Sequence, residues 1–353
     1  SARTSSGSTK HHPGCAKPMS DDPAKVLRYA ESLGRFSRRR FLVGAAAGLT
    51  LAADLFVTRL IQEQREELQI LTVRDDAAAS EFPRAMWFLF PGYKTSWEEA
   101  VWIVNSLRPA LARRGQMAAV GYSNKGLDLD TVEAEVFRHI RTRRLNRVYF
   151  YGHSFGGMVA VELAARLLAR GVQVELVILD SSPAGRFDVL DQNMIRGVVL
   201  LYEAGYRIPS ALRGGYELGE RILHKDERSW STVVDQTLEQ LSPLAPSSTL
   251  IQSESSYIYH YDAAAFAGAI GDAELAFIGN PGDETVNYYT ARARWTEVFP
   301  NNMVSNSLVT EGARPAHASP QWNPVVYQRV VDEVLDTYVP VPAVGGGGGK
   351  VPF

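Results

Sequence analysis

One segment, residues 152–157 with the sequence GHSFGG, constrains this chain more than any other. It follows the apolar run 147–151 and precedes a helical apolar pattern at 158–165, so we expect a strand, a sharp turn and a helix in that order. Glycines on both sides of Ser154 allow a strained turn that lifts its hydroxyl clear of a sheet, and the positive N-terminus of the next helix then points at it. The segment therefore predicts a nucleophilic serine at position 154.

A second segment, GYSNKG at 121–126, also follows an apolar run but has a different spacing. Its second glycine comes one position too late, and no helix is expected directly after Ser123. We interpret it as an ordinary loop between a strand and a helix. A plain glycine-rich turn is the corresponding alternative for 152–157.

The composition is that of a globular protein and argues against several classes of function. Hydrophobic residues make up 45% of the 353 residues, charged residues 22%, and the net charge is −2. This charge gives no electrostatic basis for nucleic-acid binding. With Cys15 as the only cysteine and no histidine pair at metal-ligand spacing, we expect neither a disulfide framework nor a metal site, and no cofactor.

The N-terminal part resembles an export signal. Residues 1–36 are predicted to be a disordered leader, and three arginines at 38–40 then precede an apolar stretch at 41–53. Because this pattern resembles a bacterial twin-arginine signal, we expect residues 37–61 to direct export to the periplasm, the cell surface or the medium. The alternatives are membrane attachment through this segment and a basic surface helix. Asp54 interrupts the apolar run before it reaches the ~20 residues of a spanning helix.

From residue 65 onward, short apolar runs alternate with amphipathic helical patterns. The apolar runs lie at 68–73, 85–90, 117–121, 147–151, 174–180, 274–279 and 303–310. Near-continuous apolar strands separated by helices predict an α/β fold with a mostly parallel sheet that is buried on both faces.

The core is expected in two parts, 65–183 and 271–339, with a long insertion between them. Residues 184–270 far exceed an ordinary crossover and predict a helical cap. Helical patterns in this part of the chain lie at 194–206, 215–223 and 231–241, and residues 340–353 form a glycine-rich tail that we expect to be flexible.

A serine hydroxyl becomes a good nucleophile only when a neighbouring base takes its proton. The histidines that follow the serine are His224, His260 and His317, and only His317 lies beyond the next-to-last strand, in a loop before the final helix. Its place in the order makes His317 the expected base, although a loop histidine is often a solvated surface residue.

The base needs a carboxylate to orient it, and two aspartates compete for this role. Asp283 lies in a Gly/Pro turn after the strand 274–279, whereas Asp180 ends the strand before it. We favour Asp283, with Asp180 as the alternative acid and Glu284 as a third choice. A simple turn-forming role is the other interpretation of Asp283.

The oxyanion of a tetrahedral intermediate needs two preset N–H donors. We expect the backbone N–H of Phe155, directly after the nucleophile, and that of Tyr93, in the turn 91–93 that ends a strand. Gly92 would let this turn approach closely. His153 is interpreted as structural.

With these residues assigned, the chain from about 68 to 339 resembles the α/β-hydrolase superfamily. The resemblance implies an eight-stranded, mostly parallel sheet, a helical cap and cofactor-free acyl transfer to water. One departure is that Pro91-Gly92 stands where His-Gly is usual before the oxyanion loop.

We therefore expect an exported serine esterase or lipase-like hydrolase that acts on a small-molecule or lipid-like acyl substrate. Ser154 would attack the carbonyl, His317 would transfer the proton and Asp283 would orient His317. A thioesterase, peptidase or acyltransferase would use the same residues. A catalytically silent fold that acts as a binding protein is the alternative from another class, and no oligomeric state is predicted.

Overall fold

The computed structural model describes residues 64–203, 246–304 and 308–338. The expected leader (1–36), export segment (37–61) and tail (340–353) lie outside these residues, as do the predicted cap helices at 215–223 and 231–241. Within the described ranges, no helix is both long and apolar enough to cross a membrane.

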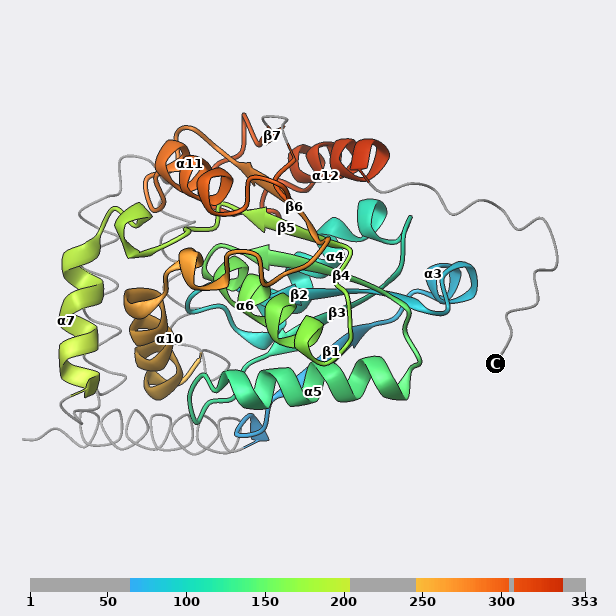
Figure 1. The fold of residues 1–353 in the computed structure, drawn as a ribbon, viewed down its shortest axis with the longest axis horizontal. Coiled ribbons are helices and arrows are strands. Elements are labelled where there is room, and N and C mark those ends of the chain that lie inside the picture. Colours follow the sequence, from blue (N-terminus) through green and yellow to red (C-terminus); the bar gives the residue numbers. More distant parts are fainter. Residues whose placement is uncertain (1–63, 204–245, 305–307, 339–353) are drawn as a thin grey trace, which may run out of the picture. The chain divides into compact units, whose positions relative to one another are not determined.

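Seven strands form one sheet in the order β1-β3-β2-β4-β5-β6-β7 (Figure 1). They are β1 (Gln69–Val73), β2 (Ala85–Phe90), β3 (Gln116–Gly121), β4 (Arg147–His153), β5 (Leu176–Asp180), β6 (Glu274–Gly279) and β7 (Leu308–Val309). Only β1 runs antiparallel to its neighbour. The mostly parallel sheet confirms the expected fold class, and the described part of the chain contains seven strands where the resemblance implied eight.

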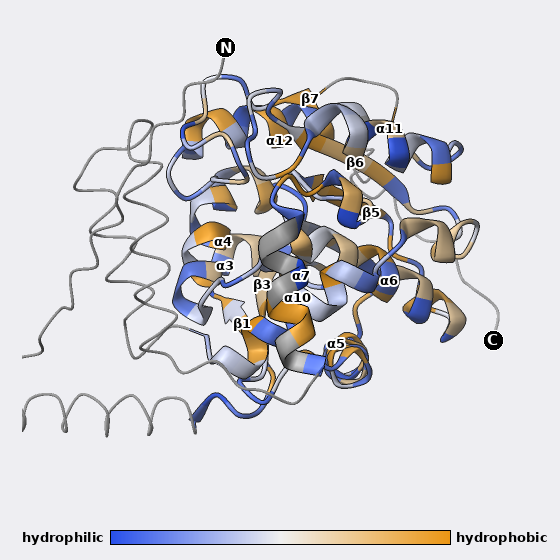
Figure 2. Ribbon diagram, turned by 90° about the vertical axis from the view of Figure 1, so that its left-hand side faces the viewer, coloured by the Kyte–Doolittle hydropathy of each residue, from blue (hydrophilic) through white to orange (hydrophobic). Residues whose placement is uncertain are grey.

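Helices cover both faces of this sheet (Figure 1). They are α3 (Asp76–Glu81), α4 (Trp97–Leu111), α5 (Leu129–Thr142), α6 (Phe155–Ala169), α7 (Gln192–Glu203), α10 (Ser248–His260), α11 (Tyr288–Val298) and α12 (Pro324–Tyr338). Side chains of α4 and α12 pack in one apolar layer, and those of α5, α6 and α11 pack in the other. The helices in Figure 2 accordingly carry both hydrophobic and hydrophilic stretches.

Strand β2 shows why the apolar runs of this sequence form buried strands. Phe88 and Phe90 belong to the layer of α5 and α6, whereas Trp87 and Leu89 belong to the layer of α4 and α12. Successive side chains point to opposite faces, so a strand covered on both faces must be apolar at every position. All six residues of β2 are buried.

The insertion between β5 and β6 contains α7 and α10 among its described residues. Helix α7 (Gln192–Glu203) overlaps the helical pattern predicted at 194–206. Helix α10 was not predicted, because it buries the consecutive polar residues 252–255 and so lacks a clear apolar stripe. The described part of the insertion is thus helical, as expected for a cap.

The strand order reverses at the carboxyl ends of β2 and β4. From β2 the chain passes to β3 on one side and then crosses to β4 on the other side. The loops that leave two such strands separate, and ligands of open α/β sheets bind at this reversal. The loop 91–95 after β2 and the turn at Ser154 after β4 both lie at this edge.

Candidate active site

Ser154 occupies a strained turn between β4 and α6. Its backbone has φ 53° and ψ −122°, a conformation that residues with a Cβ rarely adopt. Its N–H donates to the carbonyl oxygen of Asp180 at 2.7 Å, which ties the turn to β5. Helix α6 begins at the next residue, Phe155, so its N-terminus faces the serine. Strand, turn and helix thus follow one another as the sequence predicted.

The flanking glycines are required by the packing of this turn. A Cβ at Gly152 would lie 2.3 Å from the Cα of Gly157, and a Cβ at Gly156 would lie 2.0 Å from the carbonyl oxygen of Phe90. Both contacts are with backbone atoms, which cannot move aside as a flexible side chain can. The close approach of α6 to β2 and β4 therefore depends on these two glycines.

We expect Gly156→Ala to lower the free energy of unfolding by about 3 kcal/mol, because the new methyl group must displace β2 or α6. Thermal or urea unfolding measures this change. The matched control is Gly171→Ala, where a Cβ meets nothing within 4 Å and only the positive φ of 78° is unfavourable. The control should cost about 1 kcal/mol, and equal losses in the two variants would contradict the packing argument.

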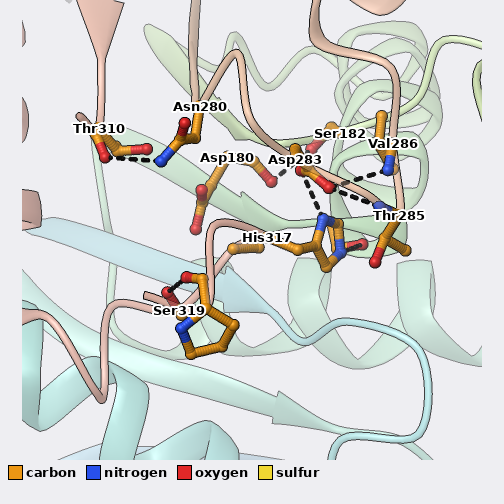
Figure 3. A network of polar contacts seen from close by, with 12 residues as sticks. Asp180, Ser182, Asn280, Asp283, Thr285, Val286, Thr310, His317 and Ser319 are labelled. Carbon is orange, nitrogen blue, oxygen red and sulfur yellow. Dashed lines mark hydrogen bonds and ion pairs between the residues drawn. The ribbon is translucent and has the colours of Figure 1, made fainter. Parts of the chain in front are cut away.

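A continuous series of hydrogen bonds joins Ser154, His317 and Asp283. Figure 3 shows the bond between His317 and Asp283. The Ser154 Oγ and the His317 Nε2 are 2.8 Å apart, and the His317 Nδ1 and the Asp283 Oδ2 are 2.7 Å apart. The other carboxylate oxygen, Oδ1 of Asp283, accepts the backbone N–H groups of Thr285 and Val286 at 2.8 and 3.0 Å. The structure therefore brings together the three residues that the sequence analysis favoured, although they lie up to 163 positions apart in the chain.

The electrostatics of this series suit a proton acceptor beside the serine. Burial lowers the pKa of His317, but the Asp283 carboxylate outweighs this effect and leaves the pKa raised. Burial raises the pKa of Asp283, and the charge and hydrogen bond of His317 together with two backbone N–H donors bring it below its ordinary value. Asp283 is thus ionised at neutral pH and strengthens His317 as a base.

Asp180, the alternative acid, is bound elsewhere. Its Oδ2 accepts the hydroxyl of Tyr151 at 2.9 Å, and its carboxyl group is fully buried. Burial raises the pKa of Asp180 to about 7, although the Tyr151 hydrogen bond opposes this. In Figure 3 the His317 ring is joined to Asp283 and not to Asp180. Glu284, the third choice, is exposed.

The remaining residues considered as base or nucleophile do not join the series. His260 is exposed and its Nε2 lies 2.8 Å from a carboxylate oxygen of Glu203, whereas His224 lies outside the described residues. Ser123, in the segment with the different spacing, donates its hydroxyl to the carbonyl oxygen of Glu66 at 2.6 Å. Its role in the structure is therefore to anchor a loop.

The loop 91–95, which contains the expected second oxyanion donor, lies against the turn at Ser154. A Cβ at Gly92 would be 2.6 Å from Nδ1 of His153, so glycine is needed for this approach. The phenol of Tyr93 accepts a hydrogen bond from Ser255 of α10 at 2.8 Å. The N-terminus of α6 touches the start of the same loop. The backbone positions 93 and 155 thus belong to two segments in direct contact.

His153 has a positioning role that its sequence context did not specify. Its Nε2 lies 2.5 Å from the carbonyl oxygen of Ala318, the residue after His317. Burial lowers the pKa of His153 to about 4, so the ring is neutral and its Nε2–H donates to that carbonyl. His153 therefore links the serine turn to the loop that carries His317. The position directly before the serine in a G-x-S-x-G segment accepts any residue, so the sequence gives no signal for this contact.

No group of three or more potential metal-ligating side chains occurs in the part of the chain that the structure describes. The side chains of Ser154, His317 and Asp283 at this site are hydrogen-bonded to one another.

Comparison with known proteins adds a match to one family model over part of the chain and a set of similar folds. Residues 98–197 match the family model of the thioesterase domain. One similar solved structure is a hydrolase from Pseudomonas aeruginosa PA01, with 17% identity and a TM-score of 0.52 over 76% of this chain and 98% of that chain. A second is a lipase-esterase related protein from Clostridium acetobutylicum, with 14% identity and a TM-score of 0.52 over 77% of this chain and 99% of that chain. A third is a meta-cleavage product hydrolase from Pseudomonas fluorescens, with 16% identity and a TM-score of 0.51 over 76% of this chain and 93% of that chain. No curated protein sequence matches the chain.

The chain has the α/β-hydrolase fold. Within this fold, the thioesterase match spans α4 to α7 and includes Ser154, but His317 and Asp283 lie beyond it. The similarity to the solved structures, at 17% identity or less, describes the α/β-hydrolase fold and leaves the reaction to be argued from the site.

Proposed function

We propose that this protein is a serine hydrolase that cleaves carboxylic esters through an acyl-enzyme intermediate. The observation that carries the proposal is the series Ser154–His317–Asp283, with the serine held in a strained turn at the N-terminus of α6. This arrangement contains a nucleophile, a base within hydrogen-bond reach and a carboxylate that orients the base. Such a set has no evident use in a protein that only binds.

The proposed reaction has two halves. In the first, His317 Nε2 takes the proton of Ser154 while Oγ forms a bond to the substrate carbonyl carbon, and the N–H groups of Phe155 and Tyr93 stabilise the oxyanion. The C–O bond to the alcohol then breaks, and His317 returns the proton to the departing alcohol. In the second half, water attacks the acyl-enzyme in the same way, and the carboxylic acid leaves while Ser154 regains its proton.

A thioesterase is the second candidate, and the family match over residues 98–197 favours it specifically. The two candidates share every step and differ in the atom that leaves, which is oxygen in one and sulfur in the other. The serine, the base and the acid therefore do not discriminate between them, and the substrate must be varied to do so.

Two measurements test the proposed function. First, a fluorophosphonate should form a single covalent adduct on Ser154 of the folded protein and none after heat unfolding, as read by peptide mass spectrometry. Second, kcat/KM should be compared for an oxygen ester and a thioester of the same acyl group. We expect the oxygen ester to be preferred by at least about tenfold, a difference of about 1.4 kcal/mol in transition-state binding. The reverse preference would favour the thioesterase, and a folded protein without adduct would contradict both.

A further inference from the structure

Helix α10 packs on the apolar core through Leu250 and Ile258, and between them it also buries a run of polar side chains. Its residues Ser253, Glu254 and Ser255 are all buried, and Glu254 and Ser255 are completely inaccessible to solvent. Burying a carboxyl group and two hydroxyl groups is unfavourable unless each finds a partner. The partners of these side chains therefore indicate what the helix does.

Two of these side chains contact the loop that follows β2. Oε2 of Glu254 accepts the backbone N–H of Lys94 at 3.2 Å, and the Ser255 hydroxyl lies 2.8 Å from the phenol of Tyr93. The contacts come from adjacent residues of α10 and reach adjacent residues of the loop. They join positions about 160 residues apart in the chain, so the loop depends on the insertion for these bonds.

The loop has a backbone conformation that needs such support. Lys94 has φ 62°, in the left-handed region that is unfavourable for a residue with a Cβ. Strained residues of this kind persist only where the surrounding contacts hold them, and they concentrate at functional sites. Here the N–H of the strained residue itself donates to the Glu254 carboxyl group.

We propose that Glu254 and Ser255 of α10 are positioning residues that hold the loop 91–95 in the conformation in which the Tyr93 N–H can stabilise the oxyanion. The inference rests on the proposed function, because it assigns the backbone of Tyr93 to acyl transfer. It makes α10, and with it the insertion between β5 and β6, a part of the catalytic arrangement. The helix acts through the loop and does not touch the reacting atoms.

The protonation state of Glu254 adds a pH dependence to this contact. Burial raises the pKa of Glu254 to about 8, although the Lys94 N–H and ammonium group oppose this. Tyr122, at the end of β3, also faces Glu254 and is fully buried. Below pH 8 the carboxyl group is neutral and fits this site, whereas above pH 8 a buried charge forms there. Because an exposed carboxyl group ionises near its ordinary pKa of 4.5, keeping Glu254 protonated in the docked helix becomes progressively less favourable from pH 4.5 to about 8, and the contact between α10 and the loop is expected to weaken over this range.

The test compares four variants in the full-length protein. Glu254→Ala and Ser255→Ala each remove one contact with the loop, and Glu254→Gln keeps a neutral acceptor for the Lys94 N–H. The matched control is Ser253→Ala on the same helix, because the Ser253 hydroxyl accepts the N–H of Leu127 and does not contact the loop 91–95. If Glu254→Ala fails to fold, Ser255→Ala and Glu254→Gln still carry the test.

Hydrogen exchange measures how well the backbone amides of the loop are protected, and this measurement does not depend on catalysis. We expect the Lys94 amide to exchange about fivefold faster or more in Glu254→Ala and Ser255→Ala than in the unaltered protein. Ser253→Ala should instead accelerate exchange at Leu127 and leave Lys94 unchanged. Unchanged exchange at Lys94 in both Glu254→Ala and Ser255→Ala would overturn the proposal, whatever the protein's activity.

Ester kinetics measure the consequence for the reaction. In Glu254→Ala and Ser255→Ala we expect kcat to fall about tenfold or more with KM within about twofold, because oxyanion donors act in the transition state. Glu254→Gln should keep kcat at pH 7 within about twofold, because glutamine keeps a neutral acceptor for the Lys94 N–H. An equal loss of kcat in Ser253→Ala would overturn the proposal, since any change of helix docking would then suffice. Failure of fluorophosphonate to label the unaltered protein would refute the proposed function. The exchange rate of the Lys94 amide would still show whether α10 holds the loop 91–95.

Discussion

Ser154→Ala is expected to lower kcat for the ester substrate by about 10⁶-fold and to abolish the fluorophosphonate adduct. The reason is that Ser154 is the only group in the hydrogen-bonded series that can form the covalent intermediate. The fold should be retained, since alanine removes one hydroxyl group and leaves the backbone turn in place. Steady-state kinetics, intact mass and thermal unfolding measure the three effects.

The control for this prediction is Ser123→Ala in the segment with the similar composition. Its hydroxyl anchors the backbone at Glu66, and no hydrogen bond joins it to His317. We expect this variant to retain kcat within about twofold and to lose about 1 kcal/mol of stability with the hydrogen bond. Substantial turnover by Ser154→Ala would contradict the assignment of the nucleophile.

Asp283→Asn is expected to lower kcat by about 10⁴-fold, because an amide can no longer hold His317 in the tautomer that accepts the serine proton. The pH profile should change as well. The His317 ring must be neutral to act as a base, so activity rises as the pH passes upward through its pKa. Asp283 raises that pKa, and its removal should therefore move the acidic limb of kcat/KM to lower pH. A pH–rate profile of the residual activity measures this shift.

Asp180→Asn is the matched variant for the alternative acid. Asparagine can still accept the Tyr151 hydroxyl, and the His317 ring is hydrogen-bonded to Asp283 and not to Asp180. We expect kcat to change by less than about tenfold and the acidic limb to move to lower pH by less than in Asp283→Asn, because Asp180 raises the pKa of His317 through its charge alone. A greater loss in Asp180→Asn than in Asp283→Asn would reverse the assignment of the acid.

Much of the fold could be predicted from local patterns. Strands β2 and β6 coincide with the expected apolar runs, because a strand buried on both faces is apolar at every position. Strand β7 is shorter than expected: of the run 303–310, residues 305–307 lie outside the described ranges, and Met303 pairs only as an isolated bridge with Leu275. Helix α10 escaped prediction because it buries the polar run 252–255 between its apolar residues, which interrupts the apolar pattern.

The residue types of the candidate site could also be predicted from the sequence. Which aspartate would bind His317 could not. Asp180 and Asp283 both follow parallel strands and so both approach the same edge of the sheet. The choice between them depends on side-chain direction, which alternates along a strand and is altered by the turn that follows it. In the structure, Asp180 meets Tyr151, whereas the turn after β6 presents Asp283 to His317.

The sequence by itself determined the features that depend on neighbouring residues. These are the alternation of strands and helices and the glycine-flanked turn at Ser154, since backbone strain and apolar periodicity are local properties. The tertiary structure alone decided which distant groups meet. Three hydrogen bonds each join residues more than 30 positions apart: His317 with Asp283, His153 with Ala318, and Lys94 with Glu254. Hydrogen bonds need positions defined to tenths of an ångström, and only the packing of the whole sheet and its helices supplies them.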